Sequence, residues 1–264
     1  MIITNDIIKE ATVRPQGFIG NRVALDASNP SSNNKSLDFW YDLSGNDNKS
    51  SFNSVTLGPN GKSFMFTPDV DPSTGVGSAT LSYATITDKS SVDVSGWNIT
   101  VECWFKTYSM DGALTSPIGI DLSTQGIYGK WDLDEPFRPR NYSLQINQGS
   151  AYWGHRSGGD WRYHFIDYSF NDSANNWVQT MYKQDANSWS FFVDGVRVAT
   201  GTDVYILEID SRPLAIGKRG DTQRIENSPY SFYGEMGVFN LWDRTLTDIE
   251  VVDNYNYYQQ IYNG

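Results

Sequence analysis

The stretch that decides the fold reads Trp189-Ser190-Phe191-Phe192-Val193-Asp194-Gly195-Val196-Arg197-Val198-Ala199. Its Asp-Gly pair stands between two runs of aromatic and β-branched residues, which are typical of strands. Such a pair favours a two-residue type I′ turn, because both central residues of that turn need positive φ. Trp189, Phe191 and Val193 alternate along the first run and therefore share one face. The stretch predicts a β-hairpin.

The composition of the whole chain favours the same fold class. The 264 residues are 14% aromatic, and the 23 glycines suit a chain with many turns. No linker or change of composition divides the chain. We therefore predict an all-β protein, a two-sheet antiparallel β-sandwich of the jelly-roll type with a short C-terminal α-helix. The sandwich is expected over residues 18–264, and residues 1–17 are expected to form an N-terminal arm or edge segment.

Strands are predicted wherever short apolar or alternating runs stand between turn residues. They are expected at 18–26, 51–57, 63–67, 79–86, 97–107, 117–121, 126–130, 142–147, 151–155, 161–168, 176–183, 188–193, 196–200, 205–208, 213–217 and 232–242.

One helix is predicted, near the C-terminus. Thr247 and Glu250 have the spacing of a capping box, with Thr247 as N-cap and Glu250 reaching back from the third helical position. Ile249, Val252 and Tyr255 follow at helical spacing. We expect about three turns that dock on a sheet through these three residues.

Charge and cysteine content exclude several classes of protein. The formal net charge is −11 and no Lys/Arg run is present, which argues against nucleic-acid binding. No apolar segment reaches the roughly 18 residues needed for membrane insertion. The start of the chain lacks the features of a signal peptide, so synthesis in a cytoplasm is expected. The single cysteine, Cys103, lies in an alternating run and is expected to be a small buried apolar residue.

Several stretches occur in the order found in one large superfamily. They are the strand Ile99–Lys106 with its central Trp104, the run Trp177–Tyr182 before the Asp-Gly hairpin, the strand Leu214–Gly217, and Tyr233–Glu250 with its closing strand, turn and capped helix. Together they resemble the laminin-G-like, concanavalin-A-like jelly-roll superfamily. This fold hosts lectins, glucanases, adhesion modules and virion parts, so the resemblance specifies a fold more than a function.

The opening of the chain narrows the resemblance. Val23–Ala27 is followed by Trp40–Asn46, and the chain ends in Asn254-Tyr255-Asn256 and a few further residues. This combination is similar to laminin-G-like domains of bacteriophage structural proteins. The resemblance implies a non-enzymatic virion module, a capsid decoration or a tail or fibre component. It would be made in the host cytoplasm, lie on the virion surface and contact other virion proteins as an oligomer.

Two other functions remain open. The first is a lectin or adhesin module that binds a cell-surface glycan, and such a protein would act extracellularly. The second is a glucanase-like hydrolase, since hydrolases of this fold commonly carry Glu-x-Asp-x-x-Glu on one strand. The nearest match has Glu208 and Asp210 but Pro213 in place of the third acid, so the motif is broken. His155 and His164 lack zinc spacing, and we expect no enzyme.

Calcium is the usual cofactor of the superfamily, held by loop oxygens. The densest acidic loop contains Asp132, Asp134 and Glu135, with Asp121 upstream. These residues cannot be matched one by one to a family metal site, and a solvated acidic loop is the favoured interpretation. The sequence therefore predicts no defined metal site.

The best candidate ligand surface is the stretch Tyr152–His164 together with Trp131. Aromatic rings stack on the C–H faces of sugars, and charged side chains bond sugar hydroxyls. The residues with this chemistry are Trp131, Trp153, His155, Arg156, Asp160 and Trp161. The alternative is that these aromatic residues point into the core or lie in a subunit contact.

Overall fold

The computed structural model describes residues 20–33, 38–67, 82–108, 124–130, 140–147, 150–157, 160–170, 175–209, 211–218 and 232–264. At residues 124, 140–141, 155–157 and 160–162 the description covers the backbone alone. The predicted arm at 1–17 and the predicted strand at 117–121 lie outside these ranges.

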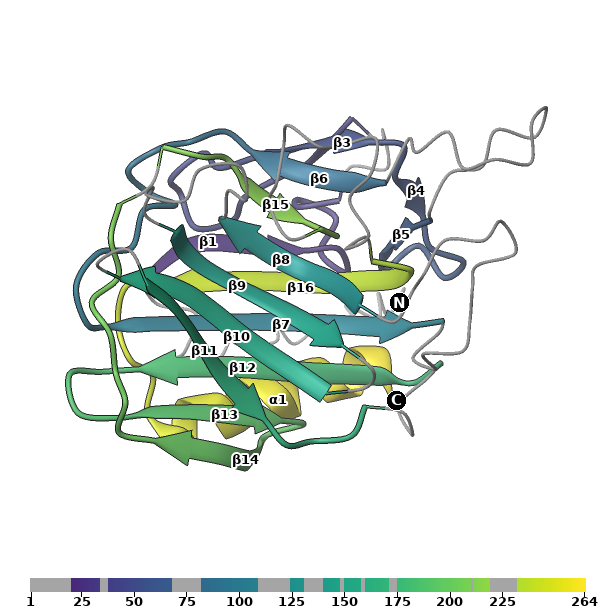
Figure 1. The fold of residues 1–264 in the computed structure, drawn as a ribbon. Helices are drawn as coiled ribbons and strands as arrows, with labels where there is room; N and C mark the ends of the chain where they lie inside the picture. The colour runs from purple at the N-terminus through teal and green to yellow at the C-terminus, as the bar shows by residue number, and fades with distance from the viewer. Residues whose placement is uncertain are drawn as a thin grey trace, which may run out of the picture.

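Two antiparallel sheets form the sandwich, as predicted (Figure 1). Sheet A has the order β14-β13-β12-β7-β16-β5-β4, with β1 also paired to β16. Its strands are β1 Asn21–Asp26, β4 Thr56–Leu57, β5 Phe64–Phe66, β7 Ile99–Thr107, β12 Trp177–Gln184, β13 Trp189–Val193, β14 Val196–Gly201 and β16 Gly234–Trp242.

Sheet B has the order β11-β10-β9-β8-β15-β6-β3-β2. Its strands are β2 Phe39–Trp40, β3 Ser50–Asn53, β6 Tyr83–Ile86, β8 Thr124–Lys130, β9 Arg140–Asn147, β10 Ser150–Ser157, β11 Asp160–Ile166 and β15 Leu214–Ile216. The predicted strand at 205–208 is absent from this part of the chain. Leu207 there forms an isolated bridge with Gly96 instead.

The core lies between the two sheets and follows the alternation expected for strands. On β7, Ile99, Val101, Cys103 and Phe105 all belong to the main core cluster, while Trp104 points to the opposite face. Cys103 is buried as predicted, and burial raises the pKa of its thiol well above the ordinary value. It is therefore a packing residue.

The Asp-Gly hairpin has the predicted geometry. Asp194 has φ 49° and Gly195 has φ 72°, and Val193 pairs with Val196 across the turn. The inward face of β13 carries Trp189, Phe191 and Val193 in the main core cluster. The hairpin is part of the scaffold.

Helix α1 (Asp248–Tyr262) begins with the predicted capping box at Thr247 and Glu250. Two of the three predicted docking residues are wrong, because Ile249 is 74% exposed and Val252 is 41% exposed, whereas Tyr255 packs on the sheet as predicted and stacks on Trp104 with centroids 5.8 Å apart. The buried residues are Val251, Asn254, Tyr258 and Tyr262. They pack on the outer face of sheet A, where Trp104, Trp177 and Val238 meet the tyrosines and a buried carboxylate meets Asn254.

The motif Trp40–Asn46 also belongs to the scaffold. The Asp42 carboxylate accepts hydrogen bonds from the backbone N–H groups of Ala24, Ser44 and Asn48, at 2.8, 2.9 and 3.1 Å. It also accepts from the side chains of Ser44 and Asn48, at 2.6 and 2.9 Å. Asp42 therefore ties the loop to strand β1, and the motif specifies the fold.

Candidate functional site

The outer face of sheet B carries the candidate site, on strands β9, β10 and β11. Tyr152 pairs with Phe165 of β11 and with Gln145 of β9. Gly154, two residues further along β10, pairs with Tyr163. Residues two apart on a strand share a face, so these strands bring Tyr152, Tyr163 and Phe165 onto one surface.

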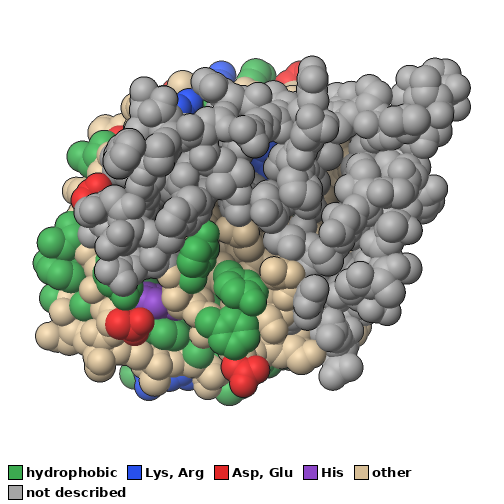
Figure 2. Space-filling model, in the orientation of Figure 1, with side chains coloured by type: hydrophobic (Ala, Val, Ile, Leu, Met, Phe, Trp, Pro, Cys, Tyr) green, Lys and Arg blue, Asp and Glu red, His purple; other side chains and the backbone are tan. Residues whose placement is uncertain are grey.

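These three rings are exposed to different degrees. Tyr163 is 41% exposed, Phe165 is 52% exposed, and Tyr152 is half-buried beside them. The rings of Tyr152 and Phe165 meet edge to face, with centroids 5.2 Å apart. Figure 2 shows hydrophobic side chains gathered on this face of the molecule. We call Tyr152, Tyr163 and Phe165 the aromatic face.

Polar groups border the aromatic face at one end. Asn147 of β9 pairs with Ser150 of β10, and both side chains are half-buried. Asp167, which is exposed, follows two residues after Phe165. The surface therefore combines rings that can stack with amide, hydroxyl and carboxylate groups that can exchange hydrogen bonds.

The opposite face of the same strands lies in the core. The Trp153 ring has no exposed surface and stacks on Tyr182, with centroids 3.7 Å apart and planes at 8°. His164 stacks on Trp189 at 4.2 Å, and its Nδ1 and Nε2 lie 3.0 Å from the Tyr182 hydroxyl and 2.9 Å from the Asp203 carbonyl. Burial lowers the pKa of His164, although the Asp203 carbonyl and carboxylate offset part of the shift. His164 is therefore a structural residue.

The predicted ligand residues divide into three groups. Trp153 belongs to the core and not to an exposed ligand surface, because its position on β10 points inward. Trp131 lies outside the described residues. For His155, Arg156, Asp160 and Trp161 the structure describes the backbone, in which Arg156 pairs with Trp161 and Ser157 with Asp160.

The predicted ligand residues did not include the three rings of the aromatic face, although they come from the same two strands. Tyr152, Tyr163 and Phe165 alternate with Trp153 and His164, so the two sets had to lie on opposite faces. Trp153 was predicted as a ligand residue because a large ring can stack on a sugar, whereas in the structure this ring fills the core.

The predictions about metal and catalysis fall mainly on residues that are not described. The acidic positions Asp121, Asp132, Asp134 and Glu135 lie outside the described ranges, as does Asp210. Within those ranges no three His, Cys, Asp or Glu residues gather closely enough to hold a metal ion. The described helix is too short and too polar to cross a membrane.

Comparisons with known proteins agree with this architecture. A family profile described as the concanavalin A-like lectin/glucanases superfamily, of the laminin G type, matches residues 78–252. A search of curated proteins finds no significant match.

Solved structures with a similar fold include toxin binding domains. The binding domain of Paraclostridial Mosquitocidal Protein 1 has a TM-score of 0.65 and 14% identity, over 92% of this chain and 53% of that chain. The botulinum neurotoxin serotype D binding domain has a TM-score of 0.61 and 13% identity, over 90% and 52%. A serotype D ligand binding domain in complex with N-acetylneuraminic acid has a TM-score of 0.59 and 14% identity, over 90% and 51%. The chain thus spans about half the length of these structures.

Proposed function

The chain belongs to the concanavalin A-like lectin/glucanases superfamily, and we propose that it is a non-catalytic glycan-binding module that recognises its ligand through the aromatic face of sheet B. The observation that carries this proposal is the exposure of Tyr163 and Phe165 beside Tyr152 on adjacent strands. Exposed apolar rings that gather on one face of a protein mark a candidate interaction surface.

The chemistry of the aromatic face suits a sugar. The C–H groups of a pyranose ring stack on an aromatic ring, while its hydroxyls need hydrogen-bonding partners nearby. The rings of Tyr152, Tyr163 and Phe165 can stack on the sugar, and the side chains of Asn147 and Asp167 can bond its hydroxyls. An acidic chain with a net charge of −11 favours neutral glycans over highly sulfated ones.

The structural neighbours support a role in receptor recognition. Those structures are binding domains of toxins, and one of them is in complex with N-acetylneuraminic acid. Since this chain spans about half of each, the whole-protein activity of such toxins is not proposed for it. N-acetylneuraminic acid is therefore included as an anionic probe beside the neutral glycans.

A glycan array tests the proposal. The wild-type chain and a Phe165→Tyr variant, which keeps the ring, are expected to retain the same set of glycans. Phe165→Ala is expected to lose most of the signal, because it removes the most exposed ring of the face. Retention of no glycan by the wild type, or equal signals from all three proteins, would contradict the proposal.

Binding without hydrolysis is part of the proposal. The broken motif, with Pro213 where the third acid is needed, supports it. Incubation of the chain with β-glucans and with its array ligands is expected to release no reducing sugar. Release that scales with protein concentration would establish a hydrolase instead.

A second candidate is the virion component implied by the opening and closing motifs. Trp40–Asn46 and the capped helix favour it as sequence features, yet both hold the fold together through Asp42 and through Thr247 and Glu250. Virion attachment and glycan binding are compatible, since a surface decoration can bind host sugars. Mass spectrometry of purified particles tests this placement, and absence of the chain from them would reject it.

A further inference from the structure

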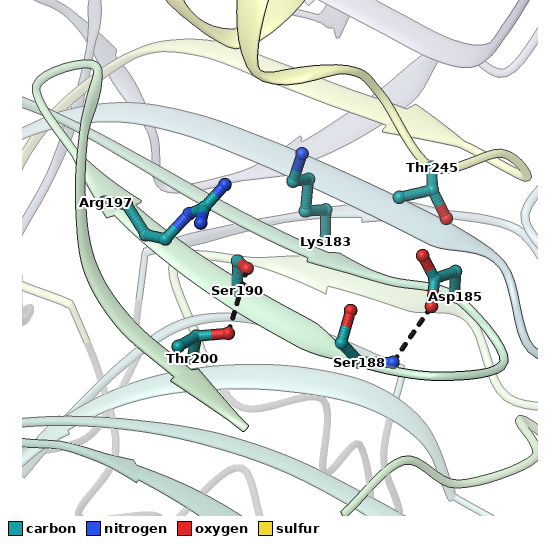
Figure 3. Close-up of a pocket in the computed structure, with 7 residues that line it drawn as sticks. All are labelled: Lys183, Asp185, Ser188, Ser190, Arg197, Thr200 and Thr245. Atoms are coloured by element: carbon teal, nitrogen blue, oxygen red, sulfur yellow. Dashed lines mark hydrogen bonds between the residues drawn. The ribbon is translucent and has the colours of Figure 1, made fainter. Parts of the chain in front are cut away.

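A small polar pocket lies on the outer face of sheet A, across the sandwich from the aromatic face (Figure 3). Strands β12, β13 and β14 form it, together with the turn between β12 and β13 and with Thr245, which precedes helix α1. Its volume is about 150 Å³. The seven side chains that line it are all polar or charged.

Two cations form one side of the pocket. The Lys183 ammonium and the Arg197 guanidinium both lie over the Phe192 ring, 5.3 and 5.4 Å from its centroid. Lys183 donates hydrogen bonds to Asp248 Oδ1 at 2.5 Å and to the Leu246 carbonyl at 2.8 Å, and Arg197 Nη2 donates to Asp248 Oδ2. In the described part of the chain these bonds leave N–H donors of both cations for a ligand.

An acceptor stands at another side. Asp185 Oδ1 accepts hydrogen bonds from the backbone N–H groups of Asn187 and Ser188, at 2.7 and 2.9 Å. The described residues offer no donor to the second oxygen, Oδ2. In Figure 3 Asp185 lies beside Ser188 and Thr245, away from Arg197. The Ser188 hydroxyl adds a group that can both donate and accept.

The floor of the pocket is made of hydroxyls that are held in place. Ser190 Oγ donates to Thr200 Oγ1 at 3.3 Å, and Thr200 Oγ1 donates to the Trp189 carbonyl at 2.8 Å. These two strands of sheet A are paired, so the floor does not depend on a ligand for its shape. The pocket is therefore preformed on a rigid part of the fold.

Charge balance selects the class of ligand. The cations Lys183 and Arg197 are matched by the carboxylates Asp185 and Asp248, so neither a free anion nor a free cation gains a net attraction. Donors on one side and an acceptor on the other match a molecule whose groups both donate and accept, as hydroxyls do. A volume of about 150 Å³ accommodates one six-membered ring, as cavities of that size hold benzene.

We propose that this pocket binds one neutral polyhydroxylated ring, a single hexose residue, independently of the aromatic face. Arg197 and Lys183 would donate to hydroxyl oxygens at one side, and Asp185 would accept from a hydroxyl at the other. The site is distinct from the aromatic face in position, in chemistry and in the residues that a variant would remove.

Titration of the full chain with sugars, followed through its amide chemical shifts, tests the proposal. The sugars are glucose, galactose and mannose, and the uncharged hexitol mannitol is the comparison without a ring. At least one hexose is expected to cause saturable shifts at Ser188, Ser190 and Thr200. Asp185→Asn keeps an oxygen for the turn and removes the free carboxylate oxygen, so it is expected to weaken this binding about tenfold or more. Asp253→Asn, an exposed aspartate on α1, is the matched control and is expected to bind like the wild type.

The outcomes separate this proposal from the glycan-binding face. Phe165→Ala is expected to leave the pocket shifts unchanged while it loses most of the array signal. Absence of saturable shifts with every hexose, or equal affinity of the Asp185→Asn variant, would overturn the pocket proposal alone. Saturable shifts with sodium acetate or glycine and none with hexoses would also overturn it, in favour of a carboxylate site.

Discussion

Replacement of Glu102 by glutamine is expected to destabilise the domain by an amount that depends on pH. Glu102 has no exposed surface and lies between sheet A and helix α1. Its Oε1 accepts from Trp104 Nε1 at 3.2 Å and from Gln179 Nε2 at 2.6 Å. Its Oε2 accepts from Asn240 Nδ2 at 2.9 Å and from Asn254 Nδ2 at 3.4 Å. One carboxylate thus joins β7, β12, β16 and α1.

The magnitude follows from the loss of one acceptor oxygen. A glutamine amide at position 102 would turn its NH₂ group towards two of these donors. Gln179 cannot simply rotate its amide, because its Oε1 accepts from the Gly195 N–H at 3.1 Å, and Asn240 Oδ1 accepts from Asn21 Nδ2 at 3.3 Å. With the NH₂ group facing Asn240 and Asn254, Asn254 can turn its amide, because its Oδ1 has no hydrogen-bond partner among the described residues. One buried donor, that of Asn240, then loses its partner at a cost of about 1–3 kcal/mol. For a domain of this size each kcal/mol lowers Tm by about 2–4 °C.

The dependence on pH follows from the pKa of Glu102. Burial raises this pKa, and the four hydrogen bonds offset only part of the shift. Because the pKa is raised in the folded state, Glu102 contributes fully to the free energy of unfolding below its unfolded pKa of about 4.3. This contribution is lost as the pH rises through the pKa of the folded state. The loss of unfolding free energy caused by Glu102→Gln, which we call its deficit, is therefore expected to be larger near about pH 4.5 than near about pH 7.5.

Urea unfolding, followed by tryptophan fluorescence at the two pH values, measures this difference. Asp253→Asn, on the exposed side of the same helix, serves as the control and is expected to change stability little at either pH. A deficit of Glu102→Gln that is negligible, or one that grows as pH rises, would refute the reasoning about this buried carboxylate.

Three further predictions concern the scaffold. Trp153→Ala is expected to lower stability by about 3–5 kcal/mol, because the ring is fully buried, and thermal unfolding by circular dichroism checks it. Gly195→Ala is expected to cost about 1–2 kcal/mol in urea unfolding, because Gly195 has φ 72° and a Cβ there would lie 3.0 Å from the Tyr255 ring. Glu235→Gln is expected to show the opposite pH dependence to Glu102→Gln. Burial raises the pKa of Glu235, but hydrogen bonds from Lys106, Ser63 and Tyr108 outweigh it and lower the pKa overall. Glu235 contributes to the free energy of unfolding above its unfolded pKa, and this contribution is lost as the pH falls through the pKa of the folded state. The deficit of Glu235→Gln is therefore expected to shrink in acid.

Local features of the fold were predictable from the sequence. The Asp194-Gly195 turn, the alternation around Cys103 and the capping box at Thr247 depend on residues close in the chain, and all three are confirmed. Each rests on backbone geometry that a few neighbouring residues decide.

The docking face of α1 was not predictable in the same way. Asn254 is buried because it meets Glu102, 152 positions earlier in the chain. This contact exists only because β7 lies between β12 and β16 in sheet A. Ile249 and Val252 are apolar but exposed, so hydrophobic spacing placed Tyr255 correctly and these two residues wrongly.

The candidate site shows the same limit. Alternation on β10 separates Tyr152 from Trp153 but does not say which of them faces the core. That choice depends on Tyr182 of the opposite sheet, which stacks on Trp153 at 3.7 Å. Tyr163 and Phe165 then follow Tyr152 to the surface through the register of β10 and β11.

Calorimetric titration of the best array glycan tests the aromatic face most directly. The Tyr163→Ala/Phe165→Ala double variant removes two exposed rings, and Ile249→Ala removes an exposed apolar side chain on α1 as the matched control. The double variant is expected to bind at least about tenfold more weakly, a loss of about 1.4 kcal/mol or more, while Ile249→Ala binds like the wild type. Equal affinities of the wild type and the double variant would contradict glycan recognition by Tyr152, Tyr163 and Phe165.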